Sequence, residues 1–107
     1  MTDVLTVLCT CPDAETAGKL AAGLIEQRLA ACVNVLPGIR SIYRWRDEVH
    51  DEGEVLLLAK TTRLAYGNLE AWLLEQHPYE TPEVLALPVQ FGAADYLDWV
   101  LNEVENR

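Results

Sequence analysis

The chain has 107 residues, half of them hydrophobic, and a formal net charge of −9 at pH 7. This length predicts a single domain over residues 1–107, and the hydrophobic content excludes an intrinsically disordered protein. The negative charge excludes a nucleic-acid-binding protein, because such proteins need clustered cations to neutralise phosphates.

The N-terminal residues and the cysteines bear on the cellular compartment. The segment after Met1 has neither a basic start nor an apolar run of membrane-spanning length, so we expect neither a signal peptide nor a membrane anchor. The three cysteines are an odd number, and Cys9 and Cys11 lie too close together in sequence for a framework disulfide. Reduced thiols are the rule in the cytoplasm, so the sequence predicts a cytoplasmic protein.

The first two predicted elements are a strand over residues 4–10 and the helix that follows it. The strand carries apolar side chains on both faces. Pro12 and Asp13 then favour the start of a helix, with Asp13 as its N-cap. The helix itself is indicated by apolar residues at helical spacing, namely Ala17, Leu20, Ala21, Leu24, Ile25 and Leu29.

Residues 30–60 hold two strand-type runs joined by a charged turn. Pro37-Gly38 interrupts the first run and predicts a bend or a bulge there. The returning run, residues 55–59, is apolar on both faces, as in a strand that is buried from both sides. Beyond Gly38 the first run alternates with period two between an aromatic face (Ile39, Ser41, Tyr43, Trp45) and a basic face (Arg40, Ile42, Arg44).

The length of these two runs predicts an overhanging hairpin. At about 3.3 Å per residue, arms of ten or more residues span about 33 Å. A domain of this size has a radius of gyration of only about 13 Å. We therefore expect the long hairpin to extend beyond its own domain and to pair with another subunit.

The remaining predicted elements are a helix over residues 61–76, a strand over 84–89 and a helix over 93–104. His77 precedes Pro78 and so ends the first of these helices, in which Leu64, Leu69, Trp72 and Leu73 recur at helical spacing. The order βαββαβ with a terminal helix predicts an α+β fold of the ferredoxin-like, split βαβ type with an antiparallel sheet.

This arrangement places both crossover helices on one face of the sheet and leaves the other face bare. The predicted strands are nevertheless apolar on both faces, and the C-terminal helix can cover only part of the bare one. A monomer rarely exposes such a patch. The sequence therefore predicts an oligomer in which another copy of the chain covers the sheet.

Short motifs that resemble one known family are spread over nearly the whole chain. They are Leu8-Cys9-Thr10, Pro12-Asp13, residues 29–34, Pro37-Gly38-Ile39, residues 41–45, Lys60-Thr61, His77-Pro78-Tyr79, Thr81-Pro82-Glu83 and residues 96–99. Together they resemble the CutA family of divalent-cation tolerance proteins. The resemblance implies a ferredoxin-like fold in a cytoplasmic homotrimer, similar in shape to the PII signal-transduction trimers. It also implies a role in tolerance of copper and other divalent metals, with metal binding.

Two cysteines and a histidine are the main candidate metal ligands. Cys9 and Cys11 are two apart on one strand, so both thiols project from the same face, about 7 Å apart at the backbone. Thiolates suit Cu(I), and imidazole suits Cu(II) or Zn(II). The resemblance implies Cys9 and His77 as copper ligands, although Gln76 stands where the family has a first histidine and Cys11 stands at a position that is often a small residue.

Each candidate ligand also has a plain structural interpretation. A cysteine such as Cys9 or Cys32 is often a small buried hydrophobe. His77 also suits a helix C-terminus, where it interacts favourably with the helix dipole. His50 lies in an acidic turn that could hold an ion weakly, although a solvated hairpin tip explains this segment better.

A second group of residues predicts a cleft between subunits. Its members are Tyr43, Trp45, Lys60, Tyr79 and Glu83. We expect the Lys60 ammonium to pair with a carboxylate, Glu54 or Glu83, because it follows a fully apolar run. The group is either an interface ion pair with aromatic packing or the ligand site of a PII-like sensor for a small organic anion or nucleotide.

The sequence lacks the motifs of common enzymes. It has no Gly-rich phosphate loop, no Ser/His/Asp set and no HExxH motif, so we expect no catalysis. The leading hypothesis is a homotrimer that binds copper or another divalent cation. A metabolite sensor and a trimeric scaffold for an unnamed protein partner remain alternatives.

Overall fold

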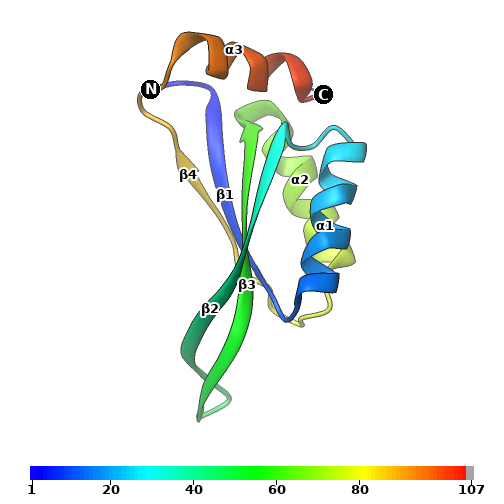
Figure 1. Cartoon of the computed structure of the whole chain (residues 1–107), viewed down its shortest axis with the longest axis vertical. Coiled ribbons are helices and arrows are strands. Elements are labelled where there is room, and N and C mark those ends of the chain that lie inside the picture. The colour runs from blue at the N-terminus through cyan, green and yellow to red at the C-terminus, as the bar shows by residue number, and fades with distance from the viewer. Residues whose placement is uncertain (106–107) are drawn as a thin grey trace.

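The computed structural model describes residues 1–105 of the chain and contains a four-stranded antiparallel sheet with three helices (Figure 1). The elements in chain order are β1 (Val4–Cys11), α1 (Ala14–Glu26), β2 (Cys32–Trp45), β3 (Glu48–Thr62), α2 (Arg63–Gln76), β4 (Val84–Pro88) and α3 (Ala94–Glu103). The strand order β2-β3-β1-β4, with every neighbouring pair antiparallel, confirms the ferredoxin-like prediction.

Both crossover helices begin at side-chain caps. The Asp13 carboxylate accepts a hydrogen bond from the Thr16 amide at 2.7 Å, as the sequence predicts. The hydroxyl of Thr62 accepts one from the Ala65 amide at 3.2 Å and caps α2. Helix α2 therefore begins two residues later than predicted, because residues 61 and 62 still pair with β1 in the sheet.

Two apolar residues of the predicted helical stripes are exposed. The buried side chains of α2 are those of Ala65, Leu69 and Leu73, which are spaced four residues apart. Leu64 lies one residue before this stripe and therefore points away from the sheet, with 71% of its surface exposed. In α1, Ile25 follows the buried Leu24 and is exposed for the same reason.

The main core lies between the sheet and helices α1 and α2, which cover the same face (Figure 1). From Thr6 onward in β1 the odd-numbered residues Val7, Cys9 and Cys11 are buried, while the even-numbered Thr6, Leu8 and Thr10 are only half-buried. This alternation continues across β3, where Val55, Leu57 and Ala59 are buried. Period two in the strands thus decides which side chains enter the core.

Strands β2 and β3 form the long hairpin that the sequence predicts, and it extends well beyond both crossover helices (Figure 1). It gives the molecule a longest dimension of 44 Å, against 25 and 21 Å in the other directions. A register shift between Leu36 and Ile39 confirms the predicted bulge, and Gly38 supplies the positive φ of 82°. At the tip, Arg46 and Asp47 form a two-residue turn with positive φ at both positions.

The opposite face of the sheet is covered only at one end. Helix α3 crosses that end and packs Val100 and Val104 against Val4 (Figure 1). Farther along the same face, Leu85 and Leu87 of β4 keep 55% and 51% of their surface exposed. The described part of the chain therefore leaves a leucine-bearing sheet face without a protein cover.

Helices α1 and α2 approach each other closely at Gly23, and this contact can be tested. A Cβ atom at Gly23 would overlap the indole ring of Trp72, whereas a Cβ at Gly18 of the same helix would meet nothing within 4 Å. We expect Gly23→Ala to lower the free energy of unfolding by about 1–3 kcal/mol through overpacking. Gly18→Ala, the matched control, should raise it by about 0.5–1 kcal/mol. Urea denaturation of both variants measures the difference, and equal effects would contradict the packing described here.

Candidate functional site

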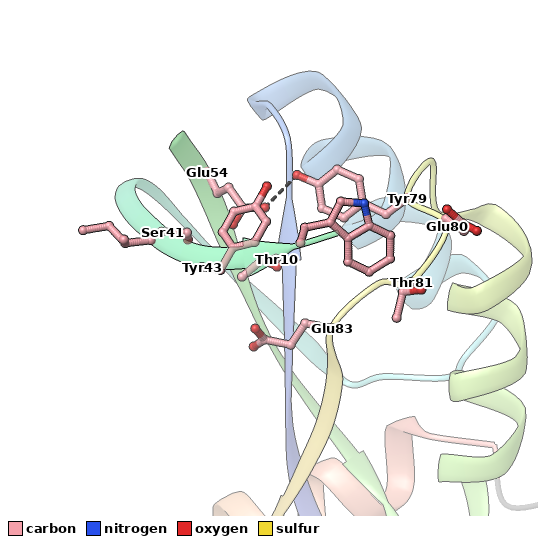
Figure 2. A pocket seen from close by; sticks show the side chains of 10 residues that line it. Thr10, Ser41, Tyr43, Glu54, Tyr79, Glu80, Thr81 and Glu83 are labelled. Atoms are coloured by element: carbon pink, nitrogen blue, oxygen red, sulfur yellow. Dashed lines mark hydrogen bonds between the residues drawn. The ribbon is translucent and has the colours of Figure 1, made fainter. Parts of the chain in front are cut away.

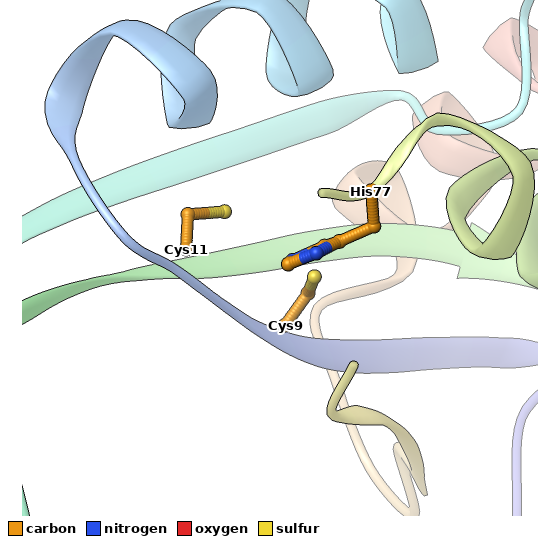
Figure 3. A group of neighbouring side chains, drawn as sticks. All are labelled: Cys9, Cys11 and His77. Atoms are coloured by element: carbon orange, nitrogen blue, oxygen red, sulfur yellow. The ribbon is translucent and has the colours of Figure 1, made fainter. Parts of the chain in front are cut away.

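Cys9, Cys11 and His77 come together on the covered face of the sheet (Figure 3). The two cysteines are adjacent inward-facing residues of β1, and His77 is the C-cap residue of α2. All three side chains are buried, and their ligand atoms lie within 4.8 Å of one another. Within residues 1–105 they are the one group of three His, Cys or acidic side chains that is placed to hold a metal ion.

Both ring nitrogens of His77 are engaged in hydrogen bonds. Its Nδ1 accepts the backbone N–H of Tyr79 at 3.1 Å. Its Nε2 lies 2.8 Å from the carbonyl oxygen of Thr10, which can only accept. The tautomer with hydrogen on Nε2 satisfies both contacts. The ring is thereby fixed beside the cysteines, and it must give up one of these bonds before it can ligate a metal.

The Cys9 thiol donates a weak hydrogen bond to the carbonyl oxygen of Thr10 at 3.9 Å. Its interaction with the neighbouring Cys11 thiol, together with burial, raises the pKa of Cys9 far above its ordinary value. The same interaction lowers the pKa of Cys11. Because the thiolate is the metal-binding form of cysteine, Cys11 is the first of the pair to become a ligand.

The other predicted metal ligands lie elsewhere. Cys32 begins β2 and is half-buried beside Tyr96 of α3. His50 lies on the hairpin, where its ring stacks on Tyr43 at a centroid distance of 5.2 Å and its Nδ1 is 3.7 Å from Glu52. Neither residue is part of the Cys9–Cys11–His77 cluster.

A pocket of about 560 Å³ opens between the hairpin and the segment that follows α2 (Figure 2). Four residues predicted for a cleft line it, namely Tyr43, Trp45, Tyr79 and Glu83. The sequence interpretation missed most of the others. The complete lining is Thr10, Ser41, Ile42, Tyr43, Trp45, Glu54, Tyr79, Glu80, Thr81 and Glu83.

Two tyrosines of the pocket donate hydrogen bonds to carboxylates. The Tyr79 hydroxyl donates to Glu54 at 2.6 Å, and the Tyr43 hydroxyl donates to Glu52. The bond to Glu52 raises the pKa of Tyr43 to about 12. Burial, followed by the bond to Glu54, raises the pKa of Tyr79 well above its ordinary value. Both phenols therefore keep their protons at neutral pH and hold the carboxylates in place.

Lys60 does not line this pocket, and the expected ion pair with Glu54 or Glu83 does not form. Its ammonium donates to the side-chain oxygen of Asn34 instead. In the sheet Lys60 pairs with Thr6 of β1, six residues along β3 from Glu54. At about 3.3 Å per residue this separates them by about 20 Å, beyond the reach of a lysine side chain.

Comparison with known proteins assigns the chain and its fold to one class. Residues 5–103 match the family model described as CutA1 divalent ion tolerance protein. The chain belongs to this family of divalent-ion tolerance proteins. No helix in the described residues combines the length and apolar character needed to cross a membrane.

Individual relatives resemble this chain over almost their full length. The divalent-cation tolerance protein CutA of Thermus thermophilus is 50% identical over 94 residues, which are 88% of this chain and 91% of the relative. The structure of Cut A1 from the same organism superposes with a TM-score of 0.93 and 46% identity, covering 95% of this chain and 99% of that one. A protein from Archaeoglobus fulgidus, named a periplasmic divalent cation tolerance protein, gives a TM-score of 0.91 and 31% identity, covering 95% of this chain and 99% of that one.

The opposite pKa shifts of the two thiols make a testable pH prediction. With the pKa of Cys11 lowered and that of Cys9 raised, the Cys11 thiolate should appear below the ordinary cysteine pKa of 9.0, while Cys9 should keep its proton well above it. In Cys9→Ala the neighbouring thiol is lost while burial and the nearby acid Glu54 remain, so the pKa of Cys11 should rise. Ultraviolet titration of thiolate measures this, with Cys32→Ala as the control. An unchanged titration of Cys11 in Cys9→Ala would contradict the interaction of the two thiols.

Proposed function

We propose that this protein contributes to metal tolerance by binding copper or another metal ion at Cys9 and Cys11, with His77 as a third ligand. The observation that carries the proposal is the convergence of two sulfurs and an imidazole within 4.8 Å. Two soft sulfur donors suit Cu(I), and the added imidazole suits Zn(II) or Cu(II). With the imidazole included, the donor set suits divalent Zn(II) or Cu(II), which are ions of the kind that the family is named for.

The protonation of the thiols supports this assignment. The interaction with Cys11, burial and the negative charge of Glu83 and Glu54 raise the pKa of Cys9. A bound cation would offset these unfavourable interactions and take the place of the thiol protons. Cys11, whose pKa is lowered, would lose its proton more readily than Cys9. Metal uptake at this site thus releases protons and strengthens as pH rises.

We further propose a homotrimer as the working assembly. The exposed Leu85 and Leu87 lie on a sheet face that α3 covers only at its end. A contiguous exposed patch of this kind marks an interaction site in a folded protein. The hairpin reaches well beyond its own helices, so it is placed to pair with a neighbouring copy. The assembly completes the sheet surface that one chain leaves open.

We propose the cytoplasm as the location, because the structure's cysteines are free thiols and a reducing compartment keeps them so. Reduced Cys9 and Cys11 are also the form that the metal site requires. The periplasmic name of the Archaeoglobus fulgidus relative belongs to that protein. Our proposal also assigns the protein a binding role and no reaction, in keeping with a family description that concerns ion tolerance.

The observations favour metal binding over the sensor of an organic anion. That alternative relied on Lys60 beside Tyr43 and Trp45, and Lys60 lies outside the pocket. The described lining instead includes the carboxylates of Glu54, Glu80 and Glu83. Negative charge in a pocket repels phosphate and carboxylate ligands. The aromatic pocket is therefore not the site of an anionic metabolite.

Metal titrations of variants test the proposed ligands. Mutating a residue that only hydrogen-bonds to a metal ligand typically lowers metal affinity about tenfold to hundredfold. We expect Cys9→Ala and Cys11→Ala, which each remove a ligand, to weaken Cu(I) binding by more than this. Because the His77 ring must first give up a hydrogen bond, His77→Gln should weaken Cu(I) binding less than either cysteine variant. Competition against a chromophoric Cu(I) chelator measures the affinities, with Cys32→Ala as the control. Identical affinities for wild type and Cys9→Ala would remove Cys9 from the site.

Sedimentation of surface variants tests the assembly. We expect wild type to sediment at three times the 12.0 kDa mass of one chain. Placing a charge on the open sheet face with Leu87→Lys should dissociate the trimer. Leu64→Lys is the matched control, because this leucine is even more exposed, at 71% against 51% for Leu87, but lies on α2, away from that face. A folded wild-type monomer at micromolar concentration would refute the trimer.

A further inference from the structure

The pocket beside the hairpin is distinct from the metal cluster. Its walls come from the hairpin, which supplies Tyr43 and Trp45, and from the segment after α2, which supplies Tyr79 (Figure 2). A volume of about 560 Å³ lies within the usual range of small-molecule sites. Cys9, Cys11 and His77 are not among its lining residues. The class of ligand that this pocket binds must therefore be inferred from its own lining side chains.

The charge of the pocket is negative. Glu54, Glu80 and Glu83 line it, and none of the described lining residues is Lys, Arg or His. Glu54 accepts a hydrogen bond from the Tyr79 hydroxyl. Because this phenol is neutral, the bond does not cancel the negative charge of the Glu54 carboxylate. The whole chain is also negative, with a formal charge of −9. The electrostatic field of the pocket therefore attracts cations.

The hydrogen-bonding groups of the pocket suit a ligand that carries hydrogen-bond donors. The phenolic protons of Tyr43 and Tyr79 are already directed at Glu52 and Glu54. The pocket presents acceptor-only carboxylates to a ligand, and the hydroxyls of Thr10, Ser41 and Thr81 can also accept. An ammonium group has three donors and no acceptor, and it is complementary to such a lining.

The protein's own Arg46 shows how the rim holds an organic cation. Its guanidinium carbon lies 5.3 Å from the centroid of the Trp45 ring. The same group forms an ion pair with Glu80 at 2.6 Å. Trp45 and Glu80 both line the pocket, so an aromatic face and a carboxylate there already act together on a cationic nitrogen group. The other two lining carboxylates, Glu54 and Glu83, have no such intramolecular cation among the described salt bridges.

We propose that this pocket binds a small aliphatic polyamine, with ammonium groups at Glu54 and Glu83 and the chain against the rings of Tyr43, Trp45 and Tyr79. Because two lining carboxylates have no cation partner, a complementary ligand carries at least two positive charges. Because aromatic rings also line the pocket, the ligand needs an apolar organic part that can contact them. An inorganic cation is disfavoured, because in the described residues the pocket's carboxylates do not converge as Cys9, Cys11 and His77 do. The site is independent of the metal proposal.

Calorimetric titration with spermidine on the full-length protein tests the proposal. We expect saturable binding that weakens with salt. Glu83→Gln should weaken it about tenfold by removing a charged partner, and Trp45→Ala about fivefold. Arg46→Gln should strengthen it by about threefold, because it removes an internal cation that competes for Glu80. A purely structural role for Arg46 would not produce this gain.

Glu26→Gln is the matched control, since it removes the same charge from an exposed position at the end of α1. It should change the affinity less than twofold. The proposal is overturned if spermidine gives no saturable heat at millimolar concentration, or if Glu83→Gln and Glu26→Gln behave alike. It is also overturned if Mg²⁺ displaces spermidine at equal concentration, because binding would then be counterion exchange. All of these variants change exposed side chains, and thermal unfolding confirms that each is folded.

Discussion

The central position of β1 is the constraint on which both candidate sites depend. The strand pairs with β3 along its whole length and with β4 from Leu5 to Cys9, so its register is fixed from both sides. Because side chains alternate along a strand, a slip of one residue would turn every one of them to the other face. The paired register holds the two thiols in the core and directs the intervening Thr10 to the opposite face.

Two local features of the hairpin build the second site. The bulge at Pro37-Gly38 adds one residue to β2 and re-aims the strand beyond it. The tight turn at Arg46-Asp47 then returns the chain as β3, which pairs with β2 as far as Trp45. As a result Tyr43 and Trp45 face the segment that follows α2, where the end of the helix at His77 directs the chain toward Tyr79. The pocket forms because the bent strand β2 and the segment that follows the end of α2 lie next to each other.

Much of this architecture follows from local patterns that the sequence displays. Period-two alternation, the cap at Asp13 and the interruption at Pro37-Gly38 are local properties, and each predicted its element correctly. The family resemblance rests on motifs spread over the chain, and the family match over residues 5–103 confirms it. The end of β3 was misplaced because Thr61 and Thr62 suit a helix start as well as a strand. Their pairing with β1 decides between the two.

The composition of the sites was harder to predict, because it depends on register between distant segments. Lys60 and Glu54 are close in sequence but lie far apart along one strand, while Glu54 and Tyr79 are distant in sequence and bonded in space. Residue types alone do not reveal such pairs. The proximity of Cys9 and Cys11 was predicted from their spacing, whereas the contact of His77 with them arises from how α2 docks on the sheet.

One consequence concerns the two residues that both sites share. Thr10 offers its carbonyl to the His77 ring and its side chain to the pocket. Tyr79 gives its amide to the same ring while its hydroxyl bonds to Glu54 on the other side. If the imidazole turned to meet an ion, it would have to release one of these neighbours, and the pocket wall would lose a support. By thermodynamic reciprocity, a ligand in the pocket would then change the affinity of the thiol cluster for an ion by the same factor.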